Sequence, residues 1–365
     1  MTQDPGLASW LQLTLTPGLG AAALRGLLKQ FGLPQQILAR RRAELSALVA
    51  PEALDALDSP AVNQAVSRAL EWTRHPAHHL ITLADESYPK ALLEIPDPPA
   101  VLYGVGRPEL LQRPSIAIVG SRNASAQGER NAESFAQSLS DAGLVVVSGL
   151  AVGIDAAAHR GGLAGMASTI AVLGTGVDVI YPRRNAQLAG AIAERGLLLS
   201  EFALGMGALA HNFPRRNRLI SGLAKGCLVV EAALASGSLI TARTAADQGR
   251  DVFAIPGSIH SPLSKGCHAL IKSGAKLVES AEDVLSELSG FRPSGYASTT
   301  LAVPATTPGD GGLLSHMGHD PVDVDSLCQR AGLSAEQVSS ELLRLELDGR
   351  VAVLPGGLYQ RLDKG

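Results

Sequence analysis

The chain has 365 residues, a length that predicts two or three domains, and its 46% hydrophobic and 18% charged residues are typical of a folded protein in water. No apolar run approaches the roughly 20 residues of a membrane span, and the N-terminus lacks a secretory signal, so we expect a cytoplasmic protein with no membrane partner. A formal net charge of -3 argues against a generally basic nucleic-acid binder, and three widely spaced cysteines argue against structural zinc or a disulfide framework.

Residues 1–80 have a mainly helical pattern and predict a small helical domain, SAM-like or helix-hairpin-helix-like. Residues 13–32, LTLTPGLGAAALRGLLKQFG, place a Pro-Gly-x-Gly turn between two apolar helical stretches. The amides of such a turn can hold a nucleic-acid phosphate, and an ordinary tight turn is the alternative. Residues 75–99, rich in proline and histidine, predict a connector.

From Pro114 onward, short apolar runs alternate with helical stretches. The runs are SIAIV, LVVVS, TIAVL, LLLS, CLVVE and VFAIP. Buried strands separated by helices are typical of βαβ units, in which a parallel sheet is covered on both faces. The fold class is therefore α/β, with a Rossmann-like parallel sheet over residues 114–288 inside a domain of residues 81–290.

Glycines and arginines follow several of these predicted strands. Small residues there let backbone amides approach an anion, and the carboxyl ends of parallel strands open on one edge of the sheet. Between Glu201 and Glu231 the chain has no acidic residue. Several phosphates on one ligand best explain this pattern. The residues are Gly120, Arg122, Gly149, Gly153, Gly174, Gly176, Arg183, Arg184, Arg215, Arg216 and Arg218.

Motifs for nicotinamide enzymes, ATP hydrolysis, serine hydrolases and metalloproteases are missing from the sequence, and we expect no catalytic site, metal or cofactor. Asp155 and His159 lie four residues apart and could form an acid–base pair, but a structural role, with both holding the loop, is preferred. Glu201 and Glu231 could bind a ribose or cap neighbouring helix amides, and capping is favoured.

Residues 291–311, rich in Ser, Thr, Pro and Gly, predict a linker. Residues 312–365 then read helix, turn at Gly332, helix, and two short strands around Pro355, which predicts a winged helix-turn-helix. The second helix, residues 334–348, carries four acidic side chains against the single Arg344, so we expect it to contact protein rather than DNA. Arg350 and Arg361, near the wing, favour DNA contact instead.

Six motifs in chain order resemble the bacterial DNA processing protein A family. They are VGSR, SGLAVGIDAAAH, GTGVDVIYPRRN, FPRRNRLISGL, VVEAALASGSLITA and GRDVFAIPG. The preceding YPKALLEIPDPPAVLYGVG is similar to the family's lead-in, so the resemblance covers most of residues 88–279. The stretch around His268 departs from the family pattern, and no role is assigned there.

The resemblance implies a protein that is not an enzyme, that binds and protects incoming single-stranded DNA, dimerises, and loads the RecA recombinase during natural transformation and recombination. The apolar-edged helix near Leu270 and Ile271, late in the core, is our candidate for the dimer interface, and the alternative is that these residues cover the sheet. The strand-contacting positions that the resemblance implies are Gly120, Ser121, Arg122, Arg184, Asn185, Phe213, Arg215, Arg216, Asn217 and Arg218. Arginines would neutralise phosphates, and Phe213 would stack on a base.

Two other functions compete with this interpretation. A Rossmann-type enzyme that cleaves nucleoside monophosphates would carry PGGxGTxxE on a loop, whereas the comparable loop reads EAALASGSLITA, without paired glycines. The second alternative is a transcription regulator that senses a small ligand, and its only support is the predicted winged helix.

Overall fold

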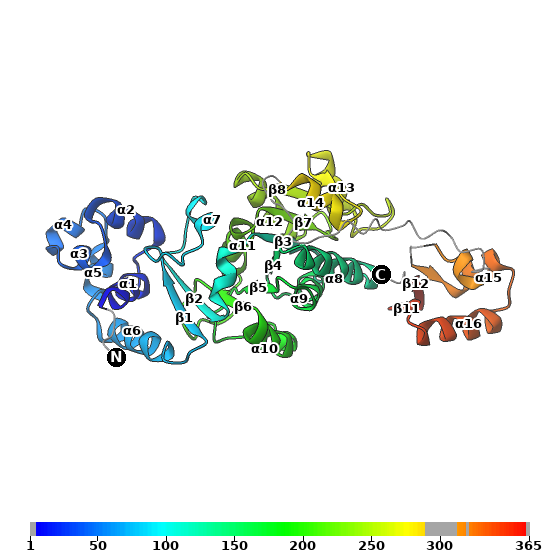
Figure 1. Cartoon of the computed structure of the whole chain (residues 1–365), viewed down its shortest axis with the longest axis horizontal. Helices are drawn as coiled ribbons and strands as arrows, with labels where there is room; N and C mark the ends of the chain where they lie inside the picture. Colours follow the sequence, from blue (N-terminus) through cyan, green and yellow to red (C-terminus); the bar gives the residue numbers. More distant parts are fainter. Residues whose placement is uncertain (1–4, 289–311, 319–320, 363–365) are drawn as a thin grey trace.

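The computed structural model describes residues 5–288, 312–318 and 321–362, and Figure 1 shows an elongated molecule with a sheet at its centre. Helices from the start of the chain lie at one end, and a small α/β unit from its last residues lies at the other. The predicted linker, residues 291–311, lies outside the described residues.

The N-terminal region is helical, as its pattern predicts. Its core is made of leucines on facing helices, with Leu13 and Leu27 fully buried. Gly18, with φ +82°, makes the turn between the first two helices, a conformation that favours glycine. The helices are α1 (Pro5–Leu15), α2 (Ala21–Phe31), α3 (Pro34–Leu38), α4 (Arg42–Leu45), α5 (Pro51–Ala56) and α6 (Pro60–Trp72).

The central sheet has nine strands in the order β1-β2-β6-β5-β4-β3-β7-β8-β9. Strands β3 to β9 pair in parallel, whereas β2 pairs antiparallel with both β1 and β6. The strands are β1 (His78–Thr82), β2 (Val101–Gly106), β3 (Ser115–Val119), β4 (Val145–Ser148), β5 (Thr169–Val172), β6 (Leu197–Ser200), β7 (Gly226–Val229), β8 (Asp251–Ala254) and β9 (Lys276–Leu277). All six predicted strands of the parallel sheet are present.

The prediction of a connector over residues 75–99 is wrong, because this stretch contains β1 and the short helix α7 (Lys90–Leu93). Strand β1 lies at the edge of the sheet, where His78 and His79 remain partly exposed while Ile81 is buried. Such a half-buried edge strand tolerates polar residues, which concealed it in the sequence.

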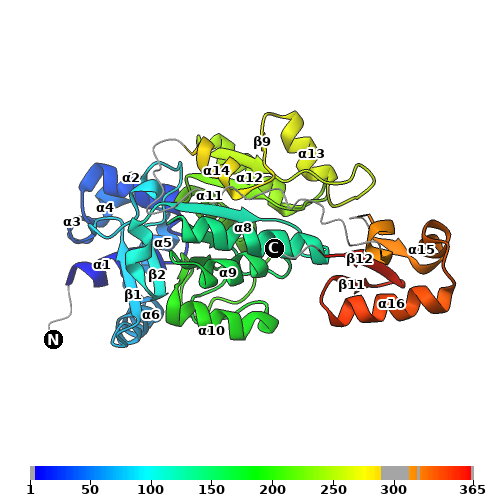
Figure 2. The ribbon, with the colours of Figure 1, turned by 45° about the vertical axis from the view of Figure 1, so that its right-hand side comes forward.

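Helices cover both faces of the parallel strands. Ile116 and Ile118 of β3 pack toward α8, α9 and α14, whereas Ala117 and Val119 pack toward α11 and α12 (Figures 1 and 2). Because both faces are buried, these strands are continuous apolar runs. The helices are α8 (Ala126–Asp141), α9 (Ile154–Ala164), α10 (Ala186–Arg195), α11 (Asn212–Leu223), α12 (Gly237–Asp247), α13 (Lys265–Lys272) and α14 (Ala281–Glu287), with short 3₁₀ turns η1 (Pro108–Gln112) and η2 (Arg183–Asn185).

The side chain of Leu270 of α13 is buried in the core that covers the sheet, and its part in a dimer interface stays a prediction. Ile271 is half-buried against the same core, so its part in self-association stays a prediction. In the described ranges, no helix is both long and apolar enough to cross a membrane.

The C-terminal unit has the predicted order of a winged helix-turn-helix. Gly332, with φ +66°, ends one helix, and Ser334 caps the next by accepting a hydrogen bond from the Gln337 amide. Its elements are η3 (Leu313–His316), β10 (Val322–Asp323), α15 (Val324–Ala331), α16 (Ala335–Leu347), β11 (Val351–Leu354) and β12 (Leu358–Arg361). The Arg130 side chain of α8 donates to the Gly349 carbonyl at 3.1 Å, which joins this unit to the core.

Candidate nucleic-acid interface

The carboxyl edge of the sheet has a switch point at β3. Strands β4, β5 and β6 follow one another on one side of β3, and β7, β8 and β9 follow one another on its other side. The loops that follow β3 and β7 therefore diverge, and a crevice opens between them where ligands of α/β proteins commonly bind.

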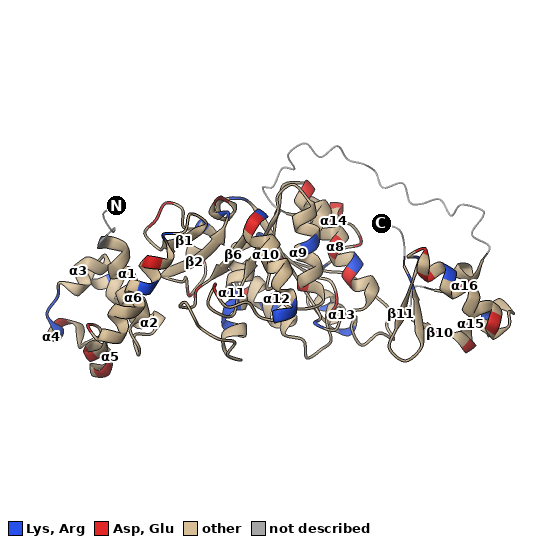
Figure 3. Cartoon of the chain, turned by 90° about the horizontal axis from the view of Figure 1, so that it is seen from below, with Lys and Arg blue, Asp and Glu red and all other residues tan. Residues whose placement is uncertain are grey.

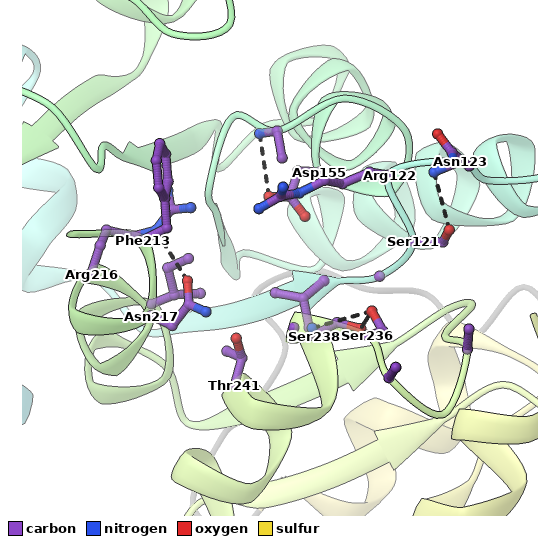
Figure 4. Close-up of a pocket in the computed structure, with 17 residues that line it drawn as sticks. Ser121, Arg122, Asn123, Asp155, Phe213, Arg216, Asn217, Ser236, Ser238 and Thr241 are labelled. Atoms are coloured by element: carbon purple, nitrogen blue, oxygen red, sulfur yellow. Dashed lines mark hydrogen bonds between the residues drawn. The ribbon is translucent and has the colours of Figure 1, made fainter. Parts of the chain in front are cut away.

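A cavity of about 400 Å³ occupies this switch point; we call it the crevice. Figure 4 shows that its walls come from the β3 loop, from α11 and from the start of α12. It is lined by Val119, Gly120, Ser121, Arg122, Asn123, Ala151, Asp155, Phe213, Arg216, Asn217, Ile220, Ala233, Ala235, Ser236, Gly237, Ser238 and Thr241. Six of the predicted strand-contacting residues, Phe213 among them, line the crevice.

The β3 loop holds its shape through short backbone contacts. A Cβ on Gly120 would lie 2.6 Å from Ile154 Cγ1, so only glycine fits there. The Ser121 hydroxyl accepts the Asn123 amide at 3.1 Å and is buried, so Ser121 shapes the loop. Arg122 is exposed and makes no ion pair within the described chain, which leaves its guanidinium available to a phosphate.

Arg216 lies under the crevice and is 4% exposed. Its Nη1 donates to the carbonyl of Gly149 at 2.7 Å and to that of Val172, and its Nε donates to Asn217 at 3.2 Å. A Cβ on Gly149 would lie 2.6 Å from the guanidinium, so the glycine makes room for it. Burial lowers the pKa of Arg216 to about 10, against the attraction of Asp155. Arg216 therefore stays charged at neutral pH and attracts anions to the crevice.

Asp155 and His159 have the structural role that the sequence favoured. Asp155 accepts the amides of Gly149 and Ala151 at 3.2 and 3.3 Å. His159 is fully buried, accepts the Leu150 amide at its Nε2 and contacts Thr169 Oγ1 through Nδ1 at 2.8 Å. Burial lowers the pKa of His159 to about 3, so the ring stays neutral and holds the β4 loop.

Phe213 stands in the first turn of α11 and is half-buried. A Cβ on Gly174 would come within 2.7 Å of the Phe213 ring, so the glycine after β5 lets the ring pack closely. On its other side, the ring lies 5.6 Å from that of Tyr181, which is 51% exposed. The two rings form an aromatic corner that a base could extend.

A second, smaller cavity of about 200 Å³ adjoins the crevice and shares Arg122, Ala151, Phe213 and Arg216 with it. It also contains Tyr181 and Arg184, and Arg184 is exposed, with no ion pair to any described residue. The side-chain Nδ2 of Asn185 donates to the carbonyls of Leu150 and Ala151 at 2.9 and 3.2 Å. Asn185, which the sequence predicts to contact the strand, therefore holds the loop after β4 in place.

Arg215 and Arg218 do not line either cavity, although the sequence predicts that they contact the strand. Both donate to Glu201 Oε2, at 3.0 and 2.7 Å, and Arg218 also donates to Asp97 at 3.2 Å. Their side of α11 faces a cavity of about 470 Å³ that is also lined by the turn at residues 16–20. Glu201 thus forms ion pairs, and its predicted capping role is wrong.

Glu231 does have the predicted capping role. Its carboxylate accepts the backbone amide of Ser125 at 2.9 Å and the Ser125 hydroxyl at 2.5 Å, just before α8 begins. Cys227 and Cys267 are buried, and the described residues contain no cluster of metal-ligating side chains.

Sequence reasoning missed the wall formed by the start of α12. Ser236 caps this helix by accepting the Ser238 amide at 3.3 Å, and Thr241 follows one turn later. The signal was present, because a serine before an apolar helix is typical of an N-terminus. Figure 3 shows that α11 and α12 both carry basic residues.

Comparison with known proteins gives two family matches. The model of the DNA recombination-mediator protein A family matches residues 79–289, and the DprA winged helix domain matches residues 297–357. Protein Smf of Escherichia coli is 45% identical over 312 residues, which are 82% of this chain and 81% of that protein. This chain belongs to the DNA processing protein A family.

Solved structures of the family agree with the fold. DNA processing protein A from Streptococcus pneumoniae superposes with a TM-score of 0.66 at 40% identity, over 78% of this chain and 97% of that one. The protein from Helicobacter pylori, described for its single-stranded DNA binding mode, gives 0.52 at 31% identity, over 57% and 94%. The family's α/β core and winged helix are therefore both present in this chain.

Proposed function

We propose that this protein binds single-stranded DNA along the carboxyl edge of its sheet. The observation that carries the proposal is one series of adjoining cavities in which exposed Arg122 and Arg184, without an ion pair to any described residue, flank the buried cation Arg216 and the aromatic corner. The Helicobacter pylori relative, described as binding single-stranded DNA, supports the same ligand.

The aromatic corner favours a single strand over a duplex. A base stacks on Phe213 or Tyr181 only when it has left its own stack, as in a single strand. The arginines reach phosphates, which are the same in every sequence, so binding is dominated by the backbone and depends steeply on salt.

We further propose that the bound strand is protected and passed to the RecA recombinase during natural transformation and recombination, that the protein acts as a homodimer, and that it works in the cytoplasm. Exposed Glu336 and Glu346 of the acidic helix α16, and exposed Asp348 directly after it, support a protein contact rather than a DNA contact for the winged helix. This assignment rests on charge, because a phosphate backbone repels such a surface.

The test is fluorescence anisotropy of a labelled oligothymidine and of a duplex of equal length, titrated with the full chain at several salt concentrations. We expect tighter binding of the single strand and a linear fall of log K with log salt. Equal affinity for the duplex would contradict the proposal. Release of free base from nucleoside monophosphates in the same preparation would favour the enzyme alternative.

A further inference from the structure

A fourth cavity, which we call the α9–α10 groove, adjoins the second cavity and has a volume of about 490 Å³. Figures 1 and 2 show α9 and α10 side by side next to β5 and β6. The groove is lined by Arg160, Leu163 and Ala164 of α9 and by Arg184, Asn185, Gln187, Leu188, Ala191 and Arg195 of η2 and α10. No acidic side chain lines it.

The groove is positively charged at both ends. Arg184 and Arg195 are exposed, and neither side chain pairs with a carboxylate in the described residues. The Arg195 carbonyl accepts hydrogen bonds from Ser168 and Arg107, but its guanidinium takes no part in them. Arg160 is bound by Glu129 and Glu133 of α8, so the two unpaired arginines provide the net charge.

The groove continues the series of cavities at the sheet edge. The crevice and the second cavity share Arg122 and Arg216, and the second cavity shares Arg184 with the groove. We propose that the single strand held at the sheet edge continues past Arg184 into the α9–α10 groove, where Arg195 binds a further phosphate. This inference rests on the proposed function.

The groove suits a sugar–phosphate backbone better than bases. Its lining between the arginines is Leu163, Ala164, Leu188 and Ala191, which can contact deoxyribose, and it contains no aromatic ring. Helix α10 has 10 residues and is about 15 Å long. At a spacing of about 3.4 Å per phosphate, this length holds at most about four nucleotides.

The experiment compares short and long oligothymidines, of about 4 and about 16 nucleotides, on full-length variants. We expect Arg195→Gln to leave the affinity for the short oligonucleotide unchanged. For the long one, we expect the salt slope to fall by about 0.7 and the affinity at 0.1 M salt to fall about fivefold, the effect of one lost phosphate contact relative to 1 M salt.

Two further variants make the result decisive. Arg113→Gln is the matched control, because Arg113 is also exposed but lines neither the crevice, the second cavity nor the groove, and it should change neither affinity. Arg122→Gln removes a crevice contact and should weaken both oligonucleotides. A normal thermal melt for each variant confirms that it is folded.

If Arg195→Gln binds both lengths as the wild type does while Arg122→Gln weakens both, the strand does not use the groove and the inference is wrong. An equal loss for both lengths in Arg195→Gln also overturns it, because the effect would then be indirect. If Arg122→Gln has no effect on either length, the proposed function itself fails.

Discussion

Helix α11 carries arginines on two faces, and the arginines of the two faces have different partners. Phe213, Arg216 and Asn217 share the face that lines the crevice, and Arg216 there donates hydrogen bonds to two backbone carbonyls and to the Asn217 side chain. Arg215 and Arg218 share the face toward the N-terminal helices, where Glu201 neutralises both.

The second face is part of a longer ionic chain. Arg25 of α2 pairs with Asp97, which pairs with Arg218, which in turn shares Glu201 with Arg215. This chain joins the N-terminal region to α11. A cluster of arginines therefore indicates a phosphate site only where no carboxylate is already paired with those arginines.

The largest effect is expected for Arg216→Met. The change leaves the carbonyls of Gly149 and Val172 without their donor and Asp155 without its cation, and loss of one partner of a buried charged group costs about 3–5 kcal/mol. Urea unfolding followed by circular dichroism measures this cost. Wild-type stability in the variant would show that the edge does not depend on these contacts.

Glu201→Gln should show that the two faces of α11 have different roles, one in stability and the other in DNA binding. It removes both ion pairs of a carboxylate whose side chain is 2% exposed, so we expect the free energy of unfolding to fall by about 1.5–3 kcal/mol. We expect the affinity for single strands to stay the same or rise, because Arg215 loses its carboxylate partner and becomes an uncompensated cation next to the proposed interface.

The matched control for Glu201→Gln is Glu94→Gln. Glu94 pairs with Arg250, and its side chain is 64% exposed. We therefore expect loss of this pair to lower the free energy of unfolding by no more than about 1 kcal/mol. Loss of DNA affinity in Glu201→Gln as large as in Arg216→Met would mean that both faces of α11 contact the strand.

Phe213→Ala should weaken single-strand binding by about 1–3 kcal/mol if a base stacks on the ring. The ring also packs on Gly174, so the melting temperature should fall with it. Tyr181→Ala is the cleaner companion because that ring is half exposed, and it should weaken binding without lowering the melting temperature. Wild-type binding in both variants would rule out stacking at this corner.

Arg122→Ala should lower the salt slope by about 0.7 and leave stability unchanged, because its side chain is exposed and makes no ion pair in the described structure. Titrations at four or more salt concentrations, together with a thermal melt, measure both quantities. An unchanged slope would remove Arg122 from the interface.

The smallest effect is expected from the winged helix. A chain that ends before residue 312 lacks the acidic helix α16, and its affinity and salt slope for single strands should match those of the full chain. A clear loss of affinity would show that this unit contacts DNA, through Arg350 or Arg361, contrary to the charge argument.

Most of the architecture could be predicted because it depends on local patterns. Apolar runs between helices indicated the six strands of the parallel sheet, and the Gly332 turn between two amphipathic helices indicated the winged helix. Strand β1 was missed because its pairing with β2, rather than its own composition, makes it a strand.

The candidate site was predictable in position but not in detail. Glycines after β3, β4 and β5 marked the edge, and the spacing of Phe213, Arg216, Asn217 and Ile220 could have shown which face of α11 lines the crevice. Arg215 and Arg218 do not fit this helical spacing, which places them on the other face of α11.

Local sequence patterns alone specify the parallel sheet, its glycine-lined carboxyl edge and the basic character of residues 202–230. Which arginines remain available to a ligand depends on tertiary contacts, because Arg218 meets Asp97 from 121 positions earlier in the chain and Arg216 lies buried beneath loops from two strands. Coulomb attraction depends on distance through space, and that distance exists only once the sheet has brought β6, α11 and the segment before β2 together.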